Sequence, residues 1–158
     1  MVLWHEDSGF GTNIAKSCCS LYSSIGKKGK PQGNEWTLLS AVVLVIQHAD
    51  SYKTEVVAMG TGSKCIGQSK MSAKGEIIND SHAEIIARRG FLRYLYQELM
   101  NAYQEKSSIF DLCHTTNLCQ LKDGISFHLF TSHTPCEYTS AMRVSQYPVY
   151  YTVFSYSM

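Results

Sequence analysis

A long amphipathic segment in the middle of the chain, NDSHAEIIARRGFLRYLYQEL (residues 79–99), constrains the fold more than any other feature. Its apolar side chains recur at spacings of three, four or seven, and no glycine or proline follows Gly90 within it, so it predicts a helix. Ser81 is a good N-cap, which makes His82 the first helical residue and places Glu84 on the first turn. The apolar positions are Ile85, Leu92, Leu95, Leu99 and, beyond the segment, Tyr103.

Such a helix needs an apolar surface to pack on, and β-rich segments lie on both sides of it. Residues 36–47 and 52–60 are separated by a short polar connection, which favours antiparallel pairing, and residues 124–132 alternate into a further strand. A second, shorter amphipathic helix is expected over residues 13–25, closed by a glycine. Strands and helices in this order predict an α/β fold whose helices cover a sheet.

The composition limits the class of protein. The chain has 158 residues, 44% hydrophobic and 17% charged, which is ordinary for one globular domain. Its longest apolar run, residues 41–46, is far shorter than the ~20 residues that cross a bilayer, and its start has no signal-peptide pattern, so we expect an intracellular protein of the nucleus or cytoplasm. A net charge of +1 gives no general attraction to nucleic acid, and the basic cluster at residues 26–31 is either a solvated turn or a phosphate contact.

Six cysteines in an intracellular chain are expected to be reduced thiols or metal ligands. Cys113 and Cys119 lie in a polar segment, residues 111–124, that resembles a loop insertion and matches no standard zinc pattern. Cys136 has a different setting, described below. The remaining three sit among apolar or small neighbours and are expected in the core: Cys18, Cys19 and Cys65.

The Ser-His-Ala-Glu sequence at the helix start allows two interpretations. It fits a capping box, in which Glu84 reaches back to the backbone N–H of Ser81. That interpretation leaves His82 unexplained, because the positive end of the helix dipole disfavours a charged histidine. Neutral imidazole is a metal ligand, and a carboxylate one turn further could act on water held by that metal.

A second helix start is expected near residue 136. Thr134 could cap it and Pro135 suits its first position, so the Cys136 thiol would lie near the positive end of the dipole, where thiolate is favoured. A buried cysteine after an X-Pro turn is the alternative. Two helix starts at one sheet can aim His82 and Cys136 at the same point, and the pair matches the H-x-E and P-C halves of the zinc deaminase signature.

At these residues the chain resembles a known family. The segments MGTGSKCIGQSKMSAKGEIINDSHAEIIARRGFLRYLYQEL and SHTPC resemble the editase domain of the adenosine deaminases acting on RNA. KKGKP, NEWTLLSAVV and KCIGQSKM are most similar to the tRNA-specific members, which act on the adenosine next to an anticodon. The resemblance covers residues 26–136. It implies a cytidine-deaminase-like three-layer fold with a mixed central sheet, incomplete at the C-terminal side.

The resemblance also implies a role for individual residues. His82 and Cys136 correspond to two of the family's three zinc ligands, and Glu84 corresponds to the proton shuttle for hydrolytic attack at C6 of a flipped-out adenine in RNA. Ser63 and Lys64 match a loop that approaches the edited nucleotide. The implied cofactor is Zn²⁺.

A second implied ligand is inositol hexakisphosphate, which in the RNA-editing relatives is buried against residues that match Asn79, Arg88 and Arg89. Paired arginines suit a polyphosphate because each offers a planar fork of donors. The alternative is a solvated helix face on which Arg88 pairs with Glu84 four residues earlier.

The resemblance ends after Cys136. The family continues with Gly-Asp and a long second half that supplies the third zinc cysteine, whereas this chain has no later cysteine and carries Thr139 three residues on. We therefore divide the chain into an N-terminal helical segment (1–25), part of an editase domain (26–136) and a divergent tail (137–158) that alternates well enough to form a strand.

A missing third ligand predicts that the 158 residues alone are inactive, with His133 and Cys65 as possible substitutes. Two further functions stay open. The chain could be a non-catalytic, shortened fragment that binds or regulates, which metal analysis would reveal. It could instead be a cytidine deaminase, although that class needs a second cysteine where Thr139 stands. No membrane association and no protein partner are expected.

Overall fold

A four-stranded mixed sheet forms the centre of the computed structural model, which describes residues 3–26, 28, 30–133 and 149–153. Strand β1 (Leu39–Gln47) pairs antiparallel with β2 (Tyr52–Thr61) on one side and with β5 (Ile125–Thr131) on the other. Strand β6 (Val149–Val153) lies parallel to β5, so the order is β2-β1-β5-β6. The three expected strands, the antiparallel pairing of the first two and a strand in the tail are confirmed.

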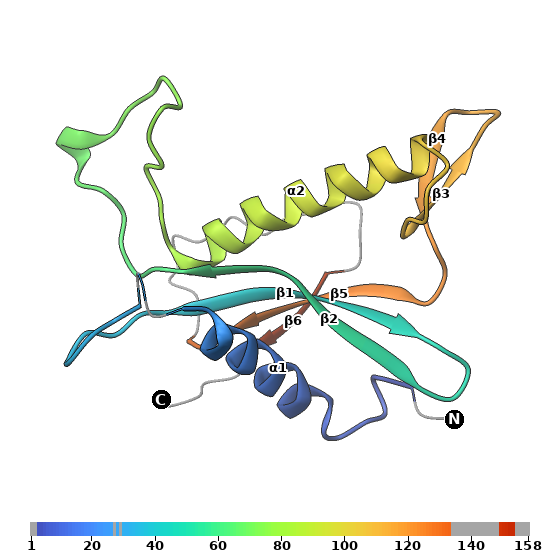
Figure 1. The fold of residues 1–158 in the computed structure, drawn as a ribbon, viewed down its shortest axis with the longest axis horizontal. Helices are drawn as coiled ribbons and strands as arrows, with labels where there is room; N and C mark the ends of the chain where they lie inside the picture. Colours follow the sequence, from blue (N-terminus) through green and yellow to red (C-terminus); the bar gives the residue numbers. More distant parts are fainter. Residues whose placement is uncertain (1–2, 27, 29, 134–148, 154–158) are drawn as a thin grey trace.

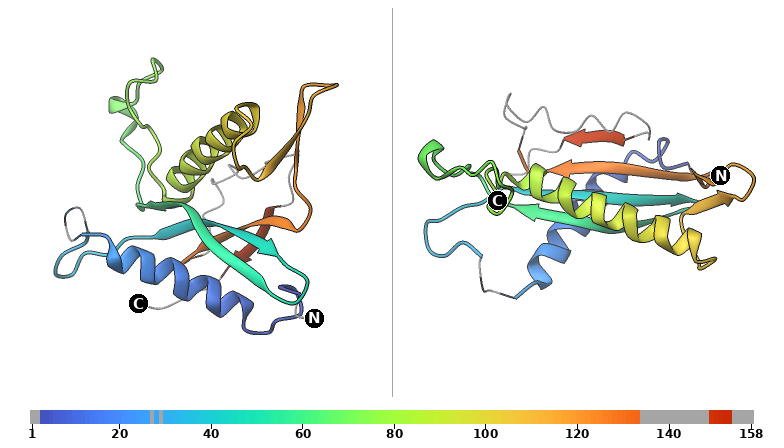
Figure 2. Two further views of the ribbon diagram at one scale, coloured as in Figure 1. Left: turned by 45° about the vertical axis from the view of Figure 1, so that its right-hand side comes forward. Right: turned by 90° about the horizontal axis from the view of Figure 1, so that it is seen from above.

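Two helices cover opposite faces of this sheet and make three layers (Figure 1). Helix α2 (Ala83–Tyr103) lies on one face and helix α1 (Phe10–Ser24) on the other, as both views of Figure 2 show. Strand β1 is buried on both faces, which explains why it is continuously apolar instead of alternating. The α/β class with a mixed central sheet is therefore confirmed.

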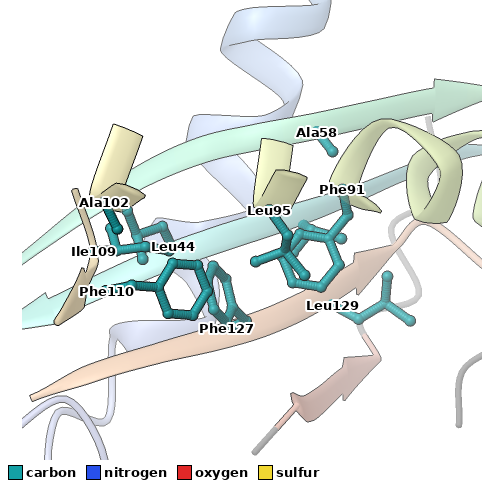
Figure 3. Packing of buried hydrophobic residues seen from close by; sticks show 10 residues of the cluster. Leu44, Ala58, Phe91, Leu95, Ala102, Ile109, Phe110, Phe127 and Leu129 are labelled. Atoms are coloured by element: carbon teal, nitrogen blue, oxygen red, sulfur yellow. The ribbon is translucent and has the colours of Figure 1, made fainter. Parts of the chain in front are cut away.

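The side chains of β1 divide the core into two clusters. Val42 and Leu44 point toward α2, whereas Val43 and Val45 point toward α1. On the α2 side, Figure 3 shows aromatic and aliphatic side chains of the helix resting on β1 and β5. The rings of Phe91 and Phe127 meet edge to face there, with centroids 4.7 Å apart. This packing fixes α2 rigidly on the sheet. The other labelled members are Ala58, Leu95, Ala102, Ile109, Phe110 and Leu129.

Three expectations from the sequence are wrong in detail. Helix α1 begins at Phe10, three residues before the expected start. The polar segment 111–124 is no plain loop, because it contributes to a two-stranded hairpin of β3 (Phe110–Cys113) and β4 (Leu118–Leu121). Cys65 is exposed instead of buried, since it lies in the long connection between β2 and α2.

Of the other two cysteines expected in the core, Cys18 is fully buried and Cys19 is half-buried. Burial raises the pKa of Cys18 to about 12, and the neighbouring Cys19 adds to the effect, so Cys18 is an inert core thiol. Within the described ranges, no helix is long and apolar enough to cross a membrane.

Candidate metal centre and active site

The candidate site lies where β2 ends and α2 begins, at one end of the sheet (Figure 1). Two segments, residues 62–66 and 79–83, run side by side there. The N–H of Ala83 donates to the carbonyl of Gly62 at 2.9 Å, and the N–H of Ile66 donates to the carbonyl of Asn79 at 3.1 Å. The Ser81 hydroxyl donates to the carbonyl of Lys64 at 2.8 Å. These cross-links hold the start of α2 against the chain that leaves β2.

Two glycines permit this close approach. A Cβ atom on Gly60 would lie 2.3 Å from the carbonyl oxygen of Ala83, and one on Gly62 would lie 2.1 Å from that of Ser81. Gly62 also has φ of +139°, which side-chain-bearing residues rarely adopt. The Gly-Thr-Gly sequence at 60–62 is therefore what lets the first turn of α2 settle on the strand end.

Helix α2 begins one residue later than expected. His82, and not Ser81, is the N-cap, with φ −59° and ψ 145°, and no side chain caps it. The Ser81 hydroxyl is used by Lys64 instead. The capping-box interpretation of Ser81 and Glu84 is therefore wrong, which removes the structural explanation for Glu84.

The His82 ring is held by its neighbour Asp80. One oxygen of this carboxylate, Oδ1, accepts the backbone N–H of His82 at 2.9 Å and lies 2.7 Å from ring atom Nδ1. Burial pushes the pKa of Asp80 upward, but the hydrogen bonds from the His82 backbone and ring outweigh burial and hold the pKa below its ordinary value. A carboxylate bonded to an imidazole in this way fixes the orientation of a metal-binding histidine.

Cys65 completes a cluster of three metal-binding groups. Its Sγ lies 3.5 Å from Nδ1 of His82, and the ligand atoms of Cys65, Asp80 and His82 all lie within 4.8 Å of one another. Imidazole nitrogen, thiolate sulfur and carboxylate oxygen are the three kinds of ligand that zinc accepts in proteins. Because Asp80 already bonds to the His82 ring, the donors left for Zn²⁺ in this cluster are the imidazole and the Cys65 thiolate, and both are ligands that zinc accepts.

Glu84 is the second unusual group of the site. Its side chain is only 3% exposed, and its Oε2 atom has no hydrogen-bond partner among the residues that the structure describes. A buried carboxylate without a partner is costly, so such groups occur mainly where a ligand or reaction supplies one. Glu84 thus has the burial expected of a group that handles a proton.

The other expected site residues divide into two places. Ser63 and Lys64 line an open groove beside the metal-binding cluster. Arg88 lies on α2 one turn after Glu84 and is half-buried, and its Nε has no hydrogen-bond partner in the described part of the chain. Arg89 is exposed. Asn79 instead bonds within its own loop, where its amide exchanges hydrogen bonds of 3.0 and 2.9 Å with the backbone of Ser72.

An ion pair between Arg88 and Glu84 is not among those found in the described residues, which removes support from the solvated-face interpretation. The expected helix start at residues 134–136, with Cys136, lies outside the described residues. The end of β5 is nevertheless near the site. The N–H of Ser132 donates to the carbonyl of Leu39 at 2.8 Å, while that of Gly62 donates to the adjacent carbonyl of Leu38 at 3.3 Å.

Sequence reasoning missed the role of Asp80 and placed Cys65 in the core. The signal for Asp80 was its position two residues before His82, because a short acidic side chain there can accept the backbone N–H two residues on. Cys65 was expected near the site only as a possible substitute ligand, and it reaches the cluster through an isolated β-bridge with Asp80.

Known proteins similar to this chain share one chemistry. The family described as the adenosine-deaminase (editase) domain matches residues 58–148. The chain is 46% identical over 147 residues to tRNA-specific adenosine deaminase 1 of Mus musculus, a match covering 85% of this chain and 28% of that protein. It is 41% identical over 123 residues to the Drosophila melanogaster protein of the same name, covering 78% of this chain and 29% of that protein.

A third relative acts on another kind of RNA. The chain is 51% identical over 131 residues to the double-stranded RNA-specific adenosine deaminase of Rattus norvegicus, covering 82% of this chain and 11% of that protein. The chain thus spans between about a tenth and three tenths of the length of these relatives.

Proposed function

Because the chain belongs to the adenosine-deaminase (editase) domain family, we propose that it serves the hydrolytic deamination of adenosine to inosine in RNA. The proposed substrate is tRNA, at the adenosine next to the anticodon, and the proposed location is the nucleus or cytoplasm. Relatives named for tRNA match 85% and 78% of this chain and a relative named for double-stranded RNA matches 82%, so the choice of tRNA rests on the resemblance of KKGKP, NEWTLLSAVV and KCIGQSKM to the tRNA-specific members. The observation that carries the proposal is the buried carboxylate of Glu84, whose Oε2 has no hydrogen-bond partner among the described residues, two residues after the oriented His82.

Zinc is the proposed cofactor, held by His82 and Cys136, with Asp80 orienting the histidine ring. Cys65 is the nearest described thiol that could add a ligand. When bound, the ion would supply Lewis acidity that makes water acidic enough to react near neutral pH.

Glu84 would move the proton in this reaction. Hydrolysis adds water across C6 and N1 of adenine and then expels ammonia, so one proton passes from the attacking water to N1 and another reaches the leaving amine. A carboxylate beside the reacting carbon can accept and return both protons. The low exposure of Glu84 keeps bulk water from competing for them.

A polyphosphate is proposed on the deeper part of α2. The Nε of Arg88 has no hydrogen-bond partner in the part of the chain that the structure describes, which fits a phosphate ligand such as inositol hexakisphosphate, and the adjacent Arg89 would add charge from the helix surface. Asn79 would contribute less than the resemblance implies, because its amide already bonds to Ser72.

The proposal is tested in a chimera in which the matched part of this chain replaces the corresponding part of the mouse relative. Glu84→Gln should leave folding and zinc content unchanged but abolish inosine formation in transcribed tRNA, because an amide is nearly isosteric with a carboxylate but shuttles no proton. Near-normal inosine formation by the variant would show that Glu84 is structural. Uridine formation by the unsubstituted chimera would instead indicate a cytidine deaminase.

For the 158-residue chain alone we expect weak zinc binding and no turnover, since the resemblance supplies only His82 and Cys136 as ligands. Purification with added zinc, followed by metal analysis and an inosine assay, checks this expectation. Near-equimolar zinc together with turnover would refute it. Equimolar zinc without turnover would favour a binding or regulatory role for the chain.

A further inference from the structure

Two loops leave the same end of the sheet and enclose a groove next to the candidate site. Residues 30–38 lead into β1, residues 62–65 follow β2, and the N–H of Gly62 donates to the carbonyl of Leu38 at 3.3 Å. The groove between them has a volume of about 800 Å³ and is lined in part by Lys30, Trp36 and Lys64. This size falls within the ~300–1,000 Å³ typical of ligand-binding pockets.

Trp36 is the exceptional residue of this groove. Its side chain is 70% exposed, although indole is among the most favourable side chains to bury. The second tryptophan, Trp4, behaves in the ordinary way and packs against the rings of Phe10 and His128 at 5.2 and 4.5 Å. An exposed indole on the wall of a polar groove is suited to stacking on a flat ligand.

The charged groups around Trp36 select the kind of ligand. Lys64 is exposed on one wall, and Lys30 on the other is held by the carbonyl of Ser23 at 3.2 Å and by the Tyr22 ring at 4.6 Å. Two cations flanking an aromatic face suit a nucleotide, whose base stacks while its phosphate is neutralised.

The acidic residue of the groove fits the same ligand. Oε2 of Glu35 accepts the backbone N–H of Gln32 at 3.0 Å, so this carboxylate is tied into its own loop. A carboxylate beside Trp36 would repel a phosphate at that point but can accept a hydrogen bond from an amino group of a base. The arrangement therefore places the base toward Glu35 and Trp36 and the phosphate toward the lysines.

We propose that this groove binds a single-stranded RNA nucleotide adjacent to the target adenosine, with its base stacked on Trp36 and its phosphate contacted by Lys30 and Lys64. Its position beside a target rests on the proposed function. The structural link is short, because the carbonyl of Lys64 accepts the Ser81 hydroxyl immediately before His82. A base held here would keep the strand in place while the neighbouring nucleotide enters the site.

The first experiment measures intrinsic tryptophan fluorescence of the 158-residue chain during titration with a short single-stranded oligoribonucleotide. Stacking on Trp36 should quench the emission, and Trp36→Phe should abolish this quenching while keeping most of the affinity. Trp36→Ala should weaken binding between about 5-fold and 160-fold, the effect of losing one stacked base. Tyr96→Ala, which removes an aromatic side chain 63% exposed on α2, is the matched control and should change nothing.

The second experiment tests the phosphate contacts through salt. Lys30→Ala and Lys64→Ala should each reduce the slope of log affinity against log salt by about 0.7, whereas Lys53→Ala on the exposed side of β2 should not. RNA binding without tryptophan quenching, equal losses for Trp36→Ala and Tyr96→Ala, or no binding at all would overturn the proposal. These readouts need no deamination, so a failure of the inosine assay leaves them interpretable.

Discussion

Gly60→Ala should displace the start of α2 and thereby the candidate site. The added Cβ would lie 2.3 Å from the carbonyl oxygen of Ala83 and 2.6 Å from the nitrogen of Ala87. Ordinary contact begins at 3.4 Å, so strand and helix must separate by about 1 Å. Both neighbours are helix backbone atoms and cannot rotate away as a side chain would. Ala83 stands between His82 and Glu84, so both move with it.

The expected cost is at the upper end of the range for overpacking, about 3 kcal/mol. For a domain of this size that corresponds to a fall in melting temperature of roughly 6–12 °C. Thermal denaturation by circular dichroism measures the loss. Amide hydrogen exchange measures the displacement, because the N–H of Ala83 donates to the carbonyl of Gly62 at 2.9 Å and should lose protection.

Gly67→Ala is the matched control. Gly67 has φ −60° and ψ 146°, which alanine adopts freely, and an added Cβ there meets nothing within 4 Å. This substitution should leave the melting temperature unchanged or raise it slightly, because alanine restricts the unfolded chain. If Gly60→Ala behaved like Gly67→Ala, with Ala83 still protected, the close packing of β2 and α2 would not be what positions the site.

Three further predictions concern other parts of the molecule. Burial lowers the pKa of His128 from 6.5 to about 4, so unfolding between pH 4 and 6.5 takes up a proton. The free energy of unfolding should therefore decline as the pH falls from about 6.5 toward 4. His128→Gln should reduce that decline, as measured by denaturant titrations at several pH values. Asp80→Asn should weaken zinc binding about 10- to 100-fold in a chelator competition, and an unchanged affinity would contradict the orienting role. Inositol hexakisphosphate should raise the melting temperature of the chimera but not that of its Arg88→Ala/Arg89→Ala variant. Arg93→Ala, which removes an exposed arginine of the same helix, is the control and should respond like the parent. If the double variant lost only tRNA affinity and kept the parent's melting temperature, an internal polyphosphate would be contradicted.

Periodicity alone was enough to predict most of the layers. The spacing of apolar residues in 79–99 predicts the helix, and the continuous apolar run of β1 reflects helices on both sides. The expected apolar face is only partly right, because Leu95 and Leu99 pack against the core whereas Tyr103 is 54% exposed. The hairpin of β3 and β4 was missed because its segment is polar. The local signal for its turn is a single residue, Asn117, which has φ of 54°. Short polar strands on the surface leave little hydrophobic pattern to detect.

The site was predictable only where a motif fixed it. His82 and Glu84 stand in a short signature, so their proximity follows from local helix geometry. Cys65 is seventeen positions from His82 and meets it through loop pairing, which no periodicity encodes. The Ser81 hydroxyl instead bonds to the carbonyl of Lys64, through the same loop pairing. The sequence does not reveal this tertiary contact, so the hydroxyl was assigned to the local role of a helix cap.

Helix α2 divides its stabilising and chemical roles along its length. In the middle of the helix Phe91 and Leu95 are buried in the core, so that part anchors the helix. Its first two turns carry two polar atoms that are buried and unpartnered among the described residues, Glu84 Oε2 and Arg88 Nε, four positions apart. Each weakens the fold by itself, yet the Phe91 anchor is only three residues further along a rigid helix. A helix fixed along its middle can therefore hold uncompensated groups in its first two turns, where a substrate or a phosphate would satisfy them.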